Sequence, residues 1–349
     1  MVLEVETLTD GGQSATDIAT RAAAFIDGAT KTLELAMYDL RLDGEADTIV
    51  HAALTNAKTR GVAIRVAFNV DHPGPIPVPP PPTCKPEDIQ SLPVESRGIA
   101  GVPDLMHHKY VIRDGAAVWT GSLNWTNDSW TRQENVVVRV GSTDLAYAFT
   151  LDFEQLWSTG IVETSGVVDP RPALVDGVTI QPWFTPGHGD DLSHRIAKRL
   201  AQSRRRIRIA SPVLTSGPIL ATMAEIAGRH AVDVAGVVDQ TQGTEVFHQW
   251  RENGGSAWKI PLLQTVLQKL SFSGKPSTPW SPSGGVHDFM HAKCVVADDI
   301  VFVGSFNLSR SGEKNAENVL EIQSRSIADQ LAAFIDTIRA RYPAATVPA

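Results

Sequence analysis

Apolar and polar residues alternate along the chain in blocks whose period switches between that of a helix and that of a strand. Residues 15–30 carry apolar side chains three and four apart, which predicts an amphipathic helix, and the run LELAMYDL from Leu33 predicts a buried strand. A second helix and a second apolar strand follow, and this strand closes at Asp71. Two short strands around a turn, KYVIRDGAAVWTGS from Lys109, and a further strand from Glu134 complete the series before its closing helix.

The same series of predicted helices and strands occurs again in the second half of the chain. It begins with a helix over 190–203 and continues with the apolar strand RIRIASPVL from Arg206 and a strand that closes at Asp239. The paired strands AKCVVADDIVFVGS start at Ala292, and ENVLEIQ starts at Glu317. Self-similarity on this scale decides the architecture, and helices that alternate with buried strands indicate an α/β fold. We therefore expect two duplicated α/β/α halves, each a mixed central sheet flanked by helices.

The duplication divides the chain into two repeats with a linker between them. We expect the first repeat over 1–160 and the second over 178–349, joined by residues 161–177. Two long connections interrupt the pattern. Residues 72–93 contain nine prolines, which favours an extended, solvated segment, and the stretch 239–291 is sixteen residues longer than its counterpart in the first repeat. Connections of this length form binding loops or are insertions that the fold tolerates.

Composition narrows the class of protein. With 349 residues, 42% of them hydrophobic and 20% charged, the chain has ample material for a core. No apolar run approaches about 18 residues, and the start MVLEVETLTDGG has neither a basic nor an apolar segment, so we expect a soluble, cytoplasmic protein. The net charge of −8 argues weakly against a protein that coats nucleic acid. Cys84 and Cys294 are too few for a disulfide framework or a thiolate metal site, and we expect neither metal nor cofactor.

One set of chemically active residues occurs in both repeats with nearly the same spacing. In the first repeat, over 107–134, the set is His107, Lys109, Asp114, Gly121, Ser122, Asn124 and Glu134. In the second repeat, over 291–317, the set is His291, Lys293, Asp298, Gly304, Ser305, Asn307 and Glu317. The spacing differs by one residue, between the aspartate and the glycine. One such match has a chance below about one in a million from composition alone, so the two copies form a strong motif.

The spacing within each copy indicates a shared site. Side chains two apart on a strand lie on one face, so His107 lies with Lys109, and Ser122 with Asn124. Together the repeats offer two imidazoles, two ammonium groups and two amides, a surplus of donors and positive charge that suits the oxygens of a phosphate. One imidazole can attack phosphorus while the other protonates the leaving oxygen. Because each repeat supplies one imidazole of this pair, we expect a single composite site.

Neighbouring residues have supporting or structural interpretations. Glu134 and Glu317 are candidates to orient the two imidazole rings through the distal nitrogen. His108 is expected to face away from Lys109 and to have a structural role. Cys294 alternates away from the site, and we expect it to be a small buried side chain rather than a nucleophile.

The paired HxKx4D segments, each followed by GSxN and a later glutamate, resemble the phospholipase D superfamily of phosphodiesterases over nearly the whole chain. The resemblance implies halves related by a pseudo-twofold axis, one site at their seam, chemistry without a metal, and a covalent phosphohistidine intermediate. It implies that His107 is the nucleophile and that His291 protonates the leaving group and later activates water or an acceptor alcohol. It assigns the phosphate oxygens to Lys109, Lys293, Asn124 and Asn307, with Ser122 and Ser305 in support. Asp114 and Asp298 are structural partners on this interpretation, not catalysts.

The substrate stays open, because phosphodiesters occur in lipid headgroups, in nucleic acid and in small nucleotides. Phospholipid is favoured by the acidic balance and by apolar side chains in or near the two long connections, namely Ile76, Val78, Phe272, Trp280 and Phe289. Gly284 and Gly285, just before the second motif, give the backbone room to approach a substrate. We expect a monomer, since both halves are in one chain, and transient contact with a membrane surface.

Nucleic acid is the alternative substrate. The segment HRIAKRLAQSRRRIRIA contains seven basic residues, Arg195, Lys198, Arg199, Arg204, Arg205, Arg206 and Arg208. They can track a phosphate backbone, or form a solvated helix end that complements its own dipole. Trp125 and Trp130 can stack on bases, or belong to the core. A non-catalytic module that binds a phosphorylated ligand is a remote third interpretation, because no position of the motif is missing.

Overall fold

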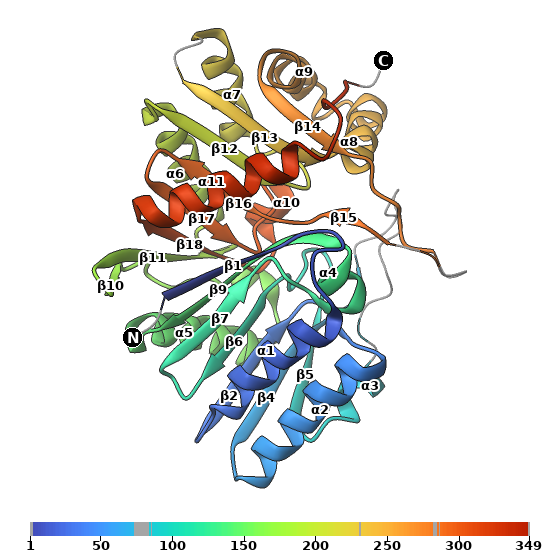
Figure 1. Ribbon diagram of the computed structural model, residues 1–349, viewed down its shortest axis with the longest axis vertical. Helices are drawn as coiled ribbons and strands as arrows, with labels where there is room; N and C mark the ends of the chain where they lie inside the picture. The colour runs from blue at the N-terminus through green and yellow to red at the C-terminus, as the bar shows by residue number, and fades with distance from the viewer. Residues whose placement is uncertain are drawn as a thin grey trace.

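Two mixed sheets, one from each half of the chain, form the frame of the molecule (Figure 1). The structure is a computed structural model that describes residues 3–72, 84, 86–229, 232–281, 285 and 287–347. The first half contains β1 (Leu3–Leu8), α1 (Ala15–Asp27), β2 (Thr32–Met37), β3 (Leu40–Arg41), α2 (Gly44–Thr59), β4 (Ala63–Val70), α3 (Pro86–Gln90), β5 (Glu95–Ala100), β6 (Lys109–Arg113), β7 (Ala117–Gly121), β8 (Trp125–Thr126), α4 (Asn127–Thr131), β9 (Gln133–Gly141) and α5 (Thr143–Thr159). The 3-10 helix η1 (Val162–Thr164) and the strand β10 (Ala173–Val175) follow. The second half contains β11 (Val178–Thr185), α6 (Gly189–Gln202), β12 (Arg206–Ser211), α7 (Gly217–Arg229), β13 (Asp233–Asp239), α8 (Gln240–Asn253), η2 (Ala257–Lys259), α9 (Ile260–Lys269), β14 (Ser271–Lys275), β15 (Phe289–Met290), β16 (Cys294–Ala297), β17 (Ile300–Gly304), α10 (Arg310–Lys314), β18 (Glu317–Gln323) and α11 (Arg325–Arg339).

The two sheets repeat one strand order. The first sheet runs β1-β9-β7-β6-β2-β4-β5, and the second runs β10-β11-β18-β17-β16-β12-β13-β14. In each, three consecutive strands are parallel, β2-β4-β5 in one and β12-β13-β14 in the other, and the remaining main strands pair antiparallel. The short strands β3 and β8 pair separately. This arrangement confirms the expected pair of duplicated α/β halves with mixed central sheets.

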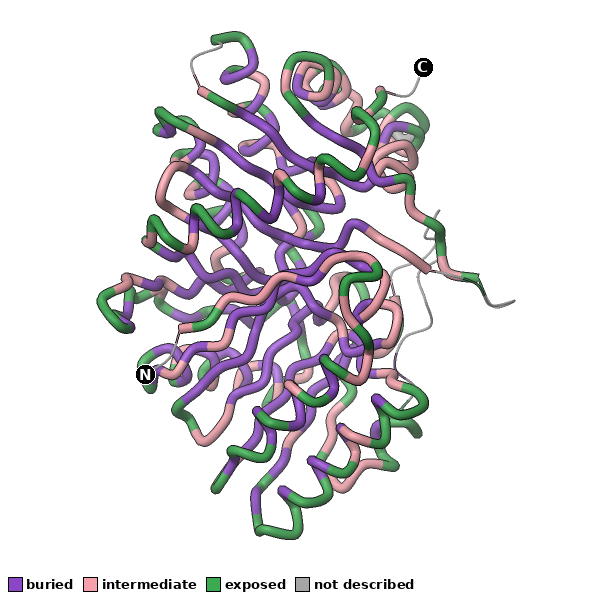
Figure 2. Tube along the Cα trace, viewed as in Figure 1, coloured by how far each residue is buried: buried purple, intermediate pink, exposed green. Residues whose placement is uncertain are grey.

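Helices cover both faces of each sheet, and the burial of alternate residues shows how the layers are built. On β2, Leu33, Leu35 and Met37 pack with α1 and α2 on the outer face, whereas Ala36 joins a core on the inner face. That inner core also contains apolar residues of α5, of α11 and of both sheets, so it is common to the two halves. The second sheet has its own outer core against α6, α7 and α9. Figure 2 shows the buried strands in purple and the exposed outer helix faces in green.

The helices of the inner core begin at matched positions. Ser142 before α5 and Ser324 before α11 each accept a hydrogen bond from the backbone N–H three residues further on, which caps the first turn. Helix α5 ends at Gly160, whose φ of 72° lies in the left-handed region that closes a helix. Among the described residues, no helix is long and apolar enough to cross a membrane.

The structure differs from the sequence-based expectation in its connections. The long stretch expected as a loop after Asp239 contains α8, α9 and β14, because apolar residues such as Phe247, Leu263 and Val266 recur on one face and are buried. Each half also starts with a strand, β1 or β11, ahead of the helix with which it was expected to open. The segment expected as a linker contains η1 and β10. The proline run 79–82, with Ile76, Val78 and Gly284, lies outside the described residues.

The motif aspartates Asp114 and Asp298 hold turns at the edge of each half. Asp114 accepts backbone N–H groups of Thr30, Lys31 and Thr32, at 2.7 to 3.1 Å, and Asp298 accepts those of three consecutive arginines, 204–206, at 2.9 to 3.1 Å. Both aspartates adopt a φ of 55°. Partial burial opposes ionisation, yet the backbone donors prevail and lower the pKa of both carboxyls. Both residues therefore fasten the loop between the first helix and the next strand.

We expect Asp114→Ala to lower the free energy of unfolding by about 1–3 kcal/mol at pH 7, because three backbone donors lose a charged acceptor. The lowered pKa means that this stabilisation is present above the ordinary carboxyl pKa, about 3.9, and is lost as the pH falls through the lower folded value. Urea unfolding of wild type and variant between pH 7 and pH 2.5 measures it. A difference between the two proteins that grows towards low pH contradicts the assignment.

Candidate active site

The two motif histidines meet because each half crosses onto the other. Before the first motif, Met106 forms a parallel bridge with Ala316, which directly precedes β18. Before the second motif, β15 pairs in parallel with β9, with Met290 opposite Glu134. Figure 1 shows β15 leaving the second half and running alongside the sheet of the first. Each histidine therefore lies against the strand that carries the other half's motif glutamate.

His107 forms a close pair with a carboxylate from the opposite half. Its Nδ1 lies 2.8 and 2.9 Å from the two carboxylate oxygens of Glu317, as expected from the sequence. Burial, followed by the charges of Lys109 and Lys293, lowers the pKa of His107 well below its usual value, and burial raises the pKa of Glu317 to about 7. Glu317 thus occupies the Nδ1 side of the ring, and Nε2 is the nitrogen left to act in the cleft. The ring of Tyr38 meets the His107 ring edge-on, with centroids 4.6 Å apart.

His291 has a different partner from the one expected. Its Nδ1 lies 3.1 Å from the side-chain oxygen of Asn135, not beside Glu134. Glu134 instead accepts a hydrogen bond from Lys275 at 3.0 Å and another from the hydroxyl of Tyr342. The expectation that both glutamates orient a histidine ring is therefore wrong for Glu134. Burial, and after it the nearby lysines, lowers the pKa of His291 well below its usual value.

The motif lysines lie directly behind the histidines. Nζ of Lys109 donates to the carbonyl of His107 at 2.7 Å, and Nζ of Lys293 donates to that of His291 at the same distance. Their exposed fractions are 1% and 3%, and neither lysine lines the cleft in which the histidines lie. Burial lowers the pKa of Lys109 to about 7, and burial also lowers that of Lys293. In this structure the two amino groups lie behind the histidines rather than in the cleft, and an anionic phosphate bound there would favour their charged form.

The motif asparagines face the site, and the motif serines do not. Asn124 and Asn307 both line the cleft, and the buried amide oxygen of each has no hydrogen-bond partner among the described residues. Ser122 donates to the side chain of Asn135 at 2.7 Å, and Ser305 accepts the backbone N–H of the matching residue in the second half at 3.0 Å. The serines thus fix the strands that carry the histidine partners, which is a supporting position.

The histidines open into one cleft of about 550 Å³ at the seam of the halves. Its lining is dominated by neutral polar and apolar side chains from both halves, including Thr126, Gln133, Gln242, Gln249, Ser277, Trp250 and Phe289. Two lining residues other than histidine are cationic, and both have partners within the described chain. Lys259 donates to the carbonyl of Thr215 at 2.9 Å, and Arg310 pairs with Asp190 and Glu313. The insertion that contains α8 and η2 thus builds one wall.

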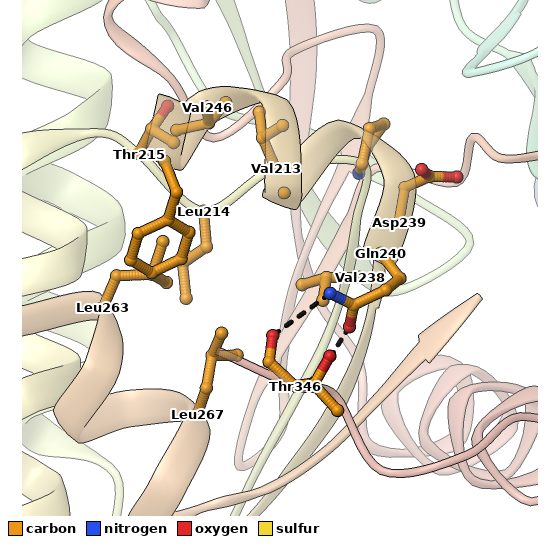
Figure 3. Close-up of a pocket in the computed structure, with 13 residues that line it drawn as sticks. Val213, Leu214, Thr215, Val238, Asp239, Gln240, Val246, Leu263, Leu267 and Thr346 are labelled. Carbon is orange, nitrogen blue, oxygen red and sulfur yellow. Dashed lines mark hydrogen bonds between the residues drawn. The ribbon is translucent and has the colours of Figure 1, made fainter. Parts of the chain in front are cut away.

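A second, smaller cavity borders this cleft (Figure 3). It has a volume of about 20 Å³ and is lined mainly by Val213, Leu214, Phe247, Leu263 and Leu267. Figure 3 shows Gln240 and Thr346 joined by two hydrogen bonds at its edge, of 2.9 and 3.1 Å. This volume admits about one water molecule, so the cavity is a packing defect and not a substrate site.

The features that favoured nucleic acid lie elsewhere. Arg195 and Arg199 both pair with the buried Glu321, and Arg206 and Arg208 pair with acidic residues of α11, Asp329 and Asp336. This basic segment also surrounds the start of β12, whereas the cleft is lined from the other end of that strand. Trp125 and Trp130 are fully buried in the outer core of the first half, with ring centroids 5.9 Å apart. Neither tryptophan is available to stack on a base.

Other expectations near the motif are met. His108 is fully buried, with Nε2 3.0 Å from a carboxylate oxygen of Asp152, and has a structural position. Cys294 is buried in the inner core, and burial raises the pKa of its thiol to about 12. The sequence interpretation missed Asn135 and Lys275. The triplet ENV occurs in both repeats and offered a signal for Asn135, but no repeated pattern pointed to Lys275.

The chain matches one family model and is similar to known proteins. The family model described as "Cardiolipin synthase, PLD-like domain" matches residues 23–157 and 196–339. The chain is similar to the mitochondrial cardiolipin hydrolase of Xenopus laevis, at 30% identity over 137 residues, which cover 37% of this chain and 56% of that protein. A protein of the same name from Chlamydomonas reinhardtii is 26% identical over 38% of this chain and 54% of its own length. The chain thus spans about half the length of these curated relatives.

Two solved structures share the fold over nearly the whole chain. The phosphatidylserine synthase of Haemophilus influenzae Rd KW20 has a TM-score of 0.65 at 15% identity, covering 97% of this chain and 86% of that one. The polyphosphate kinase of Porphyromonas gingivalis has a TM-score of 0.60 at 11% identity, covering 97% of this chain and 47% of that one. At such identities the likeness concerns the fold alone.

Proposed function

The chain belongs to the family with a phospholipase D-like domain, whose model matches both of its halves, and we propose that it hydrolyses the headgroup phosphodiester of a phospholipid through a covalent phosphohistidine. One observation carries the proposal. Two histidines from different halves, His107 and His291, line one cleft, with two buried lysines behind them and a carboxylate on one ring. This set supplies a nucleophile, a proton donor and positive charge for a phosphate.

The proposed reaction has two steps. In the first, Nε2 of His107 forms a bond to phosphorus while the bond from phosphorus to the headgroup oxygen breaks, and His291, which the negative charge of the bound phosphodiester keeps protonated, gives that oxygen its proton. The attack leaves a positive charge on the phosphorylated ring, which Glu317 stabilises through Nδ1. In the second, His291 takes a proton from water, the water oxygen attacks phosphorus, and the bond to His107 breaks. An acceptor alcohol in place of water makes the reaction a transfer.

The phosphate oxygens are assigned to the cleft face of the motif. The side-chain amides of Asn124 and Asn307 line the cleft and are placed to donate to them, with Lys109 and Lys293 acting through their charge from behind. Because side chains supply the nucleophile and the proton, we expect turnover without a metal or a cofactor. Both halves of the site come from one chain, and we propose that the monomer suffices.

Phospholipid is favoured over nucleic acid by the character of the cleft. A groove that tracks a nucleic-acid backbone uses unpaired cations, yet Lys259 and Arg310 are engaged within the protein, as are most arginines of the basic segment. The named activity of the cardiolipin hydrolases points the same way. Trp258, which is 57% exposed and lies next to the cleft residue Lys259, fits transient contact with a lipid interface.

A parallel assay of wild type and His107→Ala, with EDTA present, tests the proposal. The substrates are vesicles of phosphatidylcholine, phosphatidylglycerol or cardiolipin, and single- and double-stranded DNA and RNA. We expect wild type to release a headgroup or phosphatidic acid from at least one lipid and the variant to release none. Cleavage of nucleic acid alone, lost in the variant, makes the protein a nuclease. Loss of wild-type turnover in EDTA contradicts the metal-free mechanism, and binding without turnover of any substrate favours a binding module.

A further inference from the structure

The two copies carry the same residues at the motif positions, yet they give the histidines different partners. The difference begins in the register of the crossing strands. Met106 is opposite Ala316, so the next pair along is His107 with Glu317. Met290 is opposite Glu134 itself, so the next pair along is His291 with Asn135. A shift of one residue thus exchanges a carboxylate for an amide beside the second histidine.

The two halves differ at one pair of equivalent buried positions close to this shift in register. Asn69 and Asp239 are equivalent, because each accepts the backbone N–H of the methionine that precedes a motif histidine, at 2.9 and 3.1 Å. On the neighbouring strand, Asn69 is opposite Ile99 and Asp239 is opposite Lys275. Lys275 therefore occupies in the second half the position that Ile99 occupies in the first. Both side chains are buried, so the exchange places one buried cation on one side of the seam.

Lys275 is bound to several acidic groups in this position. Its Nζ lies 3.0 Å from Glu134, 3.0 Å from Asp10 and 3.9 Å from Asp288, and its exposed fraction is 1%. Glu134 is fully buried and is also bound by Tyr342. Arg132 pairs with the other oxygen of Asp10 at 2.6 Å. The first half has apolar Ile99 at the matching position, and there Glu317 is turned to His107 instead.

We propose that Lys275 is a positioning residue: by binding Glu134 it fixes the one-residue shift of β15 on β9 that places Asn135, and not Glu134, beside His291, and it so makes the two histidines chemically different. The inference rests on the proposed phosphodiesterase reaction and deepens it. His107, with a carboxylate on Nδ1, is suited to carry the positive charge of a phosphorylated ring. His291, with an amide oxygen on Nδ1, holds its proton less tightly and is suited to pass it to the leaving oxygen.

A histidine titration tests the role of Lys275 without any substrate. The pKa values of His107 and His291 are measured by NMR on histidine-labelled wild type, Lys275→Met and Ile99→Met, with assignments from His107→Gln and His291→Gln. Charged groups that act on the His291 ring are Lys293, Lys109, His107 and His287. They are present in every protein compared. We expect Lys275→Met to release Glu134, so that the crossing strand takes the register of the first half with Glu134 beside His291, and to raise the His291 pKa by about one unit or more. Ile99→Met, the matched control, leaves the His107 pKa unchanged.

Further variants keep the test decisive. Glu134→Gln combined with Lys275→Met removes both charges, and the His291 pKa is expected to return to its wild-type value. Tyr342→Phe removes one bond to Glu134 and keeps the ion pair, so the His291 pKa is expected to stay near its wild-type value. Lys275→Gln, which removes the charge and keeps a polar side chain, decides the question if Lys275→Met fails to fold. An unchanged His291 pKa in the folded single variants of Lys275 overturns the role of Lys275. Because no turnover is measured, the result is independent of whether the protein is a phosphodiesterase.

Discussion

His107→Ala is expected to lower kcat by at least about 10⁴-fold on every phosphodiester, whatever its leaving group. The variant lacks the atom that forms the bond to phosphorus. Of the other two imidazoles that line the cleft, His291 is already assigned to proton transfer, and His287 has its Nδ1 2.8 Å from the carbonyl oxygen of Thr278. His291→Ala is expected to cost about 10²- to 10⁴-fold on an alkyl headgroup, the range for loss of a general acid. On a p-nitrophenyl ester, whose leaving group departs without a proton, the first step of this variant is expected to recover most of that loss.

The comparison of the two variants on both substrates assigns the roles. Steady-state and burst kinetics follow p-nitrophenol release, because His291→Ala also slows the step in which water is activated. His194→Ala, an exposed histidine of α6, is the control for nonspecific loss. Recovery of the p-nitrophenyl reaction in His107→Ala, and not in His291→Ala, reverses the assignment of nucleophile and acid. If both variants lose equal activity on both substrates, the proposal that one histidine acts only as the general acid is contradicted.

Gly121→Ala is expected to lower the free energy of unfolding by at least about 3 kcal/mol. Gly121 has a φ of 142°, and a Cβ added there would collide with the backbone oxygen of Val136 on the neighbouring strand. In the second motif, a Cβ added at Gly304 would collide in the same way with the backbone oxygen of Asn318. The glycine of each GSxN segment therefore allows the strand with the serine and asparagine to lie tightly against the glutamate strand.

Urea unfolding monitored by tryptophan fluorescence measures the effect, with Gly228→Ala as the matched control. Gly228 lies on the exposed side of α7, and nothing lies within 4 Å of a Cβ built on it. Its replacement is expected to change stability by no more than about 1 kcal/mol, in the stabilising direction. A Gly121→Ala protein as stable as wild type shows that the strands can separate to admit a methyl group.

Much of this structure follows from patterns that are visible in the sequence. Buried strands such as those that start at Leu33 and Arg206 are largely apolar, and the order of elements around them repeats, so the fold and the meeting of His107 and His291 are predictable. The strand β1 was missed because LEVETL mixes apolar and charged residues, as a strand at the edge of a sheet does. Helices α8 and α9 were missed because the connection was judged by its length.

The partners of the histidines could not be predicted from the motif. Glu134 and Glu317 occupy the same motif position, and what separates them is a one-residue difference in the pairing of two short crossing segments, together with a lysine from a remote strand. Register between segments far apart in the chain is set by tertiary packing, which local pattern does not encode. Lys109 and Lys293 lie behind the histidines instead of in the cleft, and this placement is likewise set by tertiary packing that the motif does not encode.

The inner core shared by the two halves ties catalysis to stability. Helices α5 and α11 pack into one apolar cluster with strands of both sheets. The two halves therefore cannot separate without exposing that cluster to water. The chain consequently behaves as a dimer fused into one polypeptide: both motif copies are present at a fixed stoichiometry, and their encounter does not depend on protein concentration. In a symmetric dimer of identical chains both copies must carry the same residue at each position. In one chain the two halves can differ, and they do at the matched positions of Ile99 and Lys275.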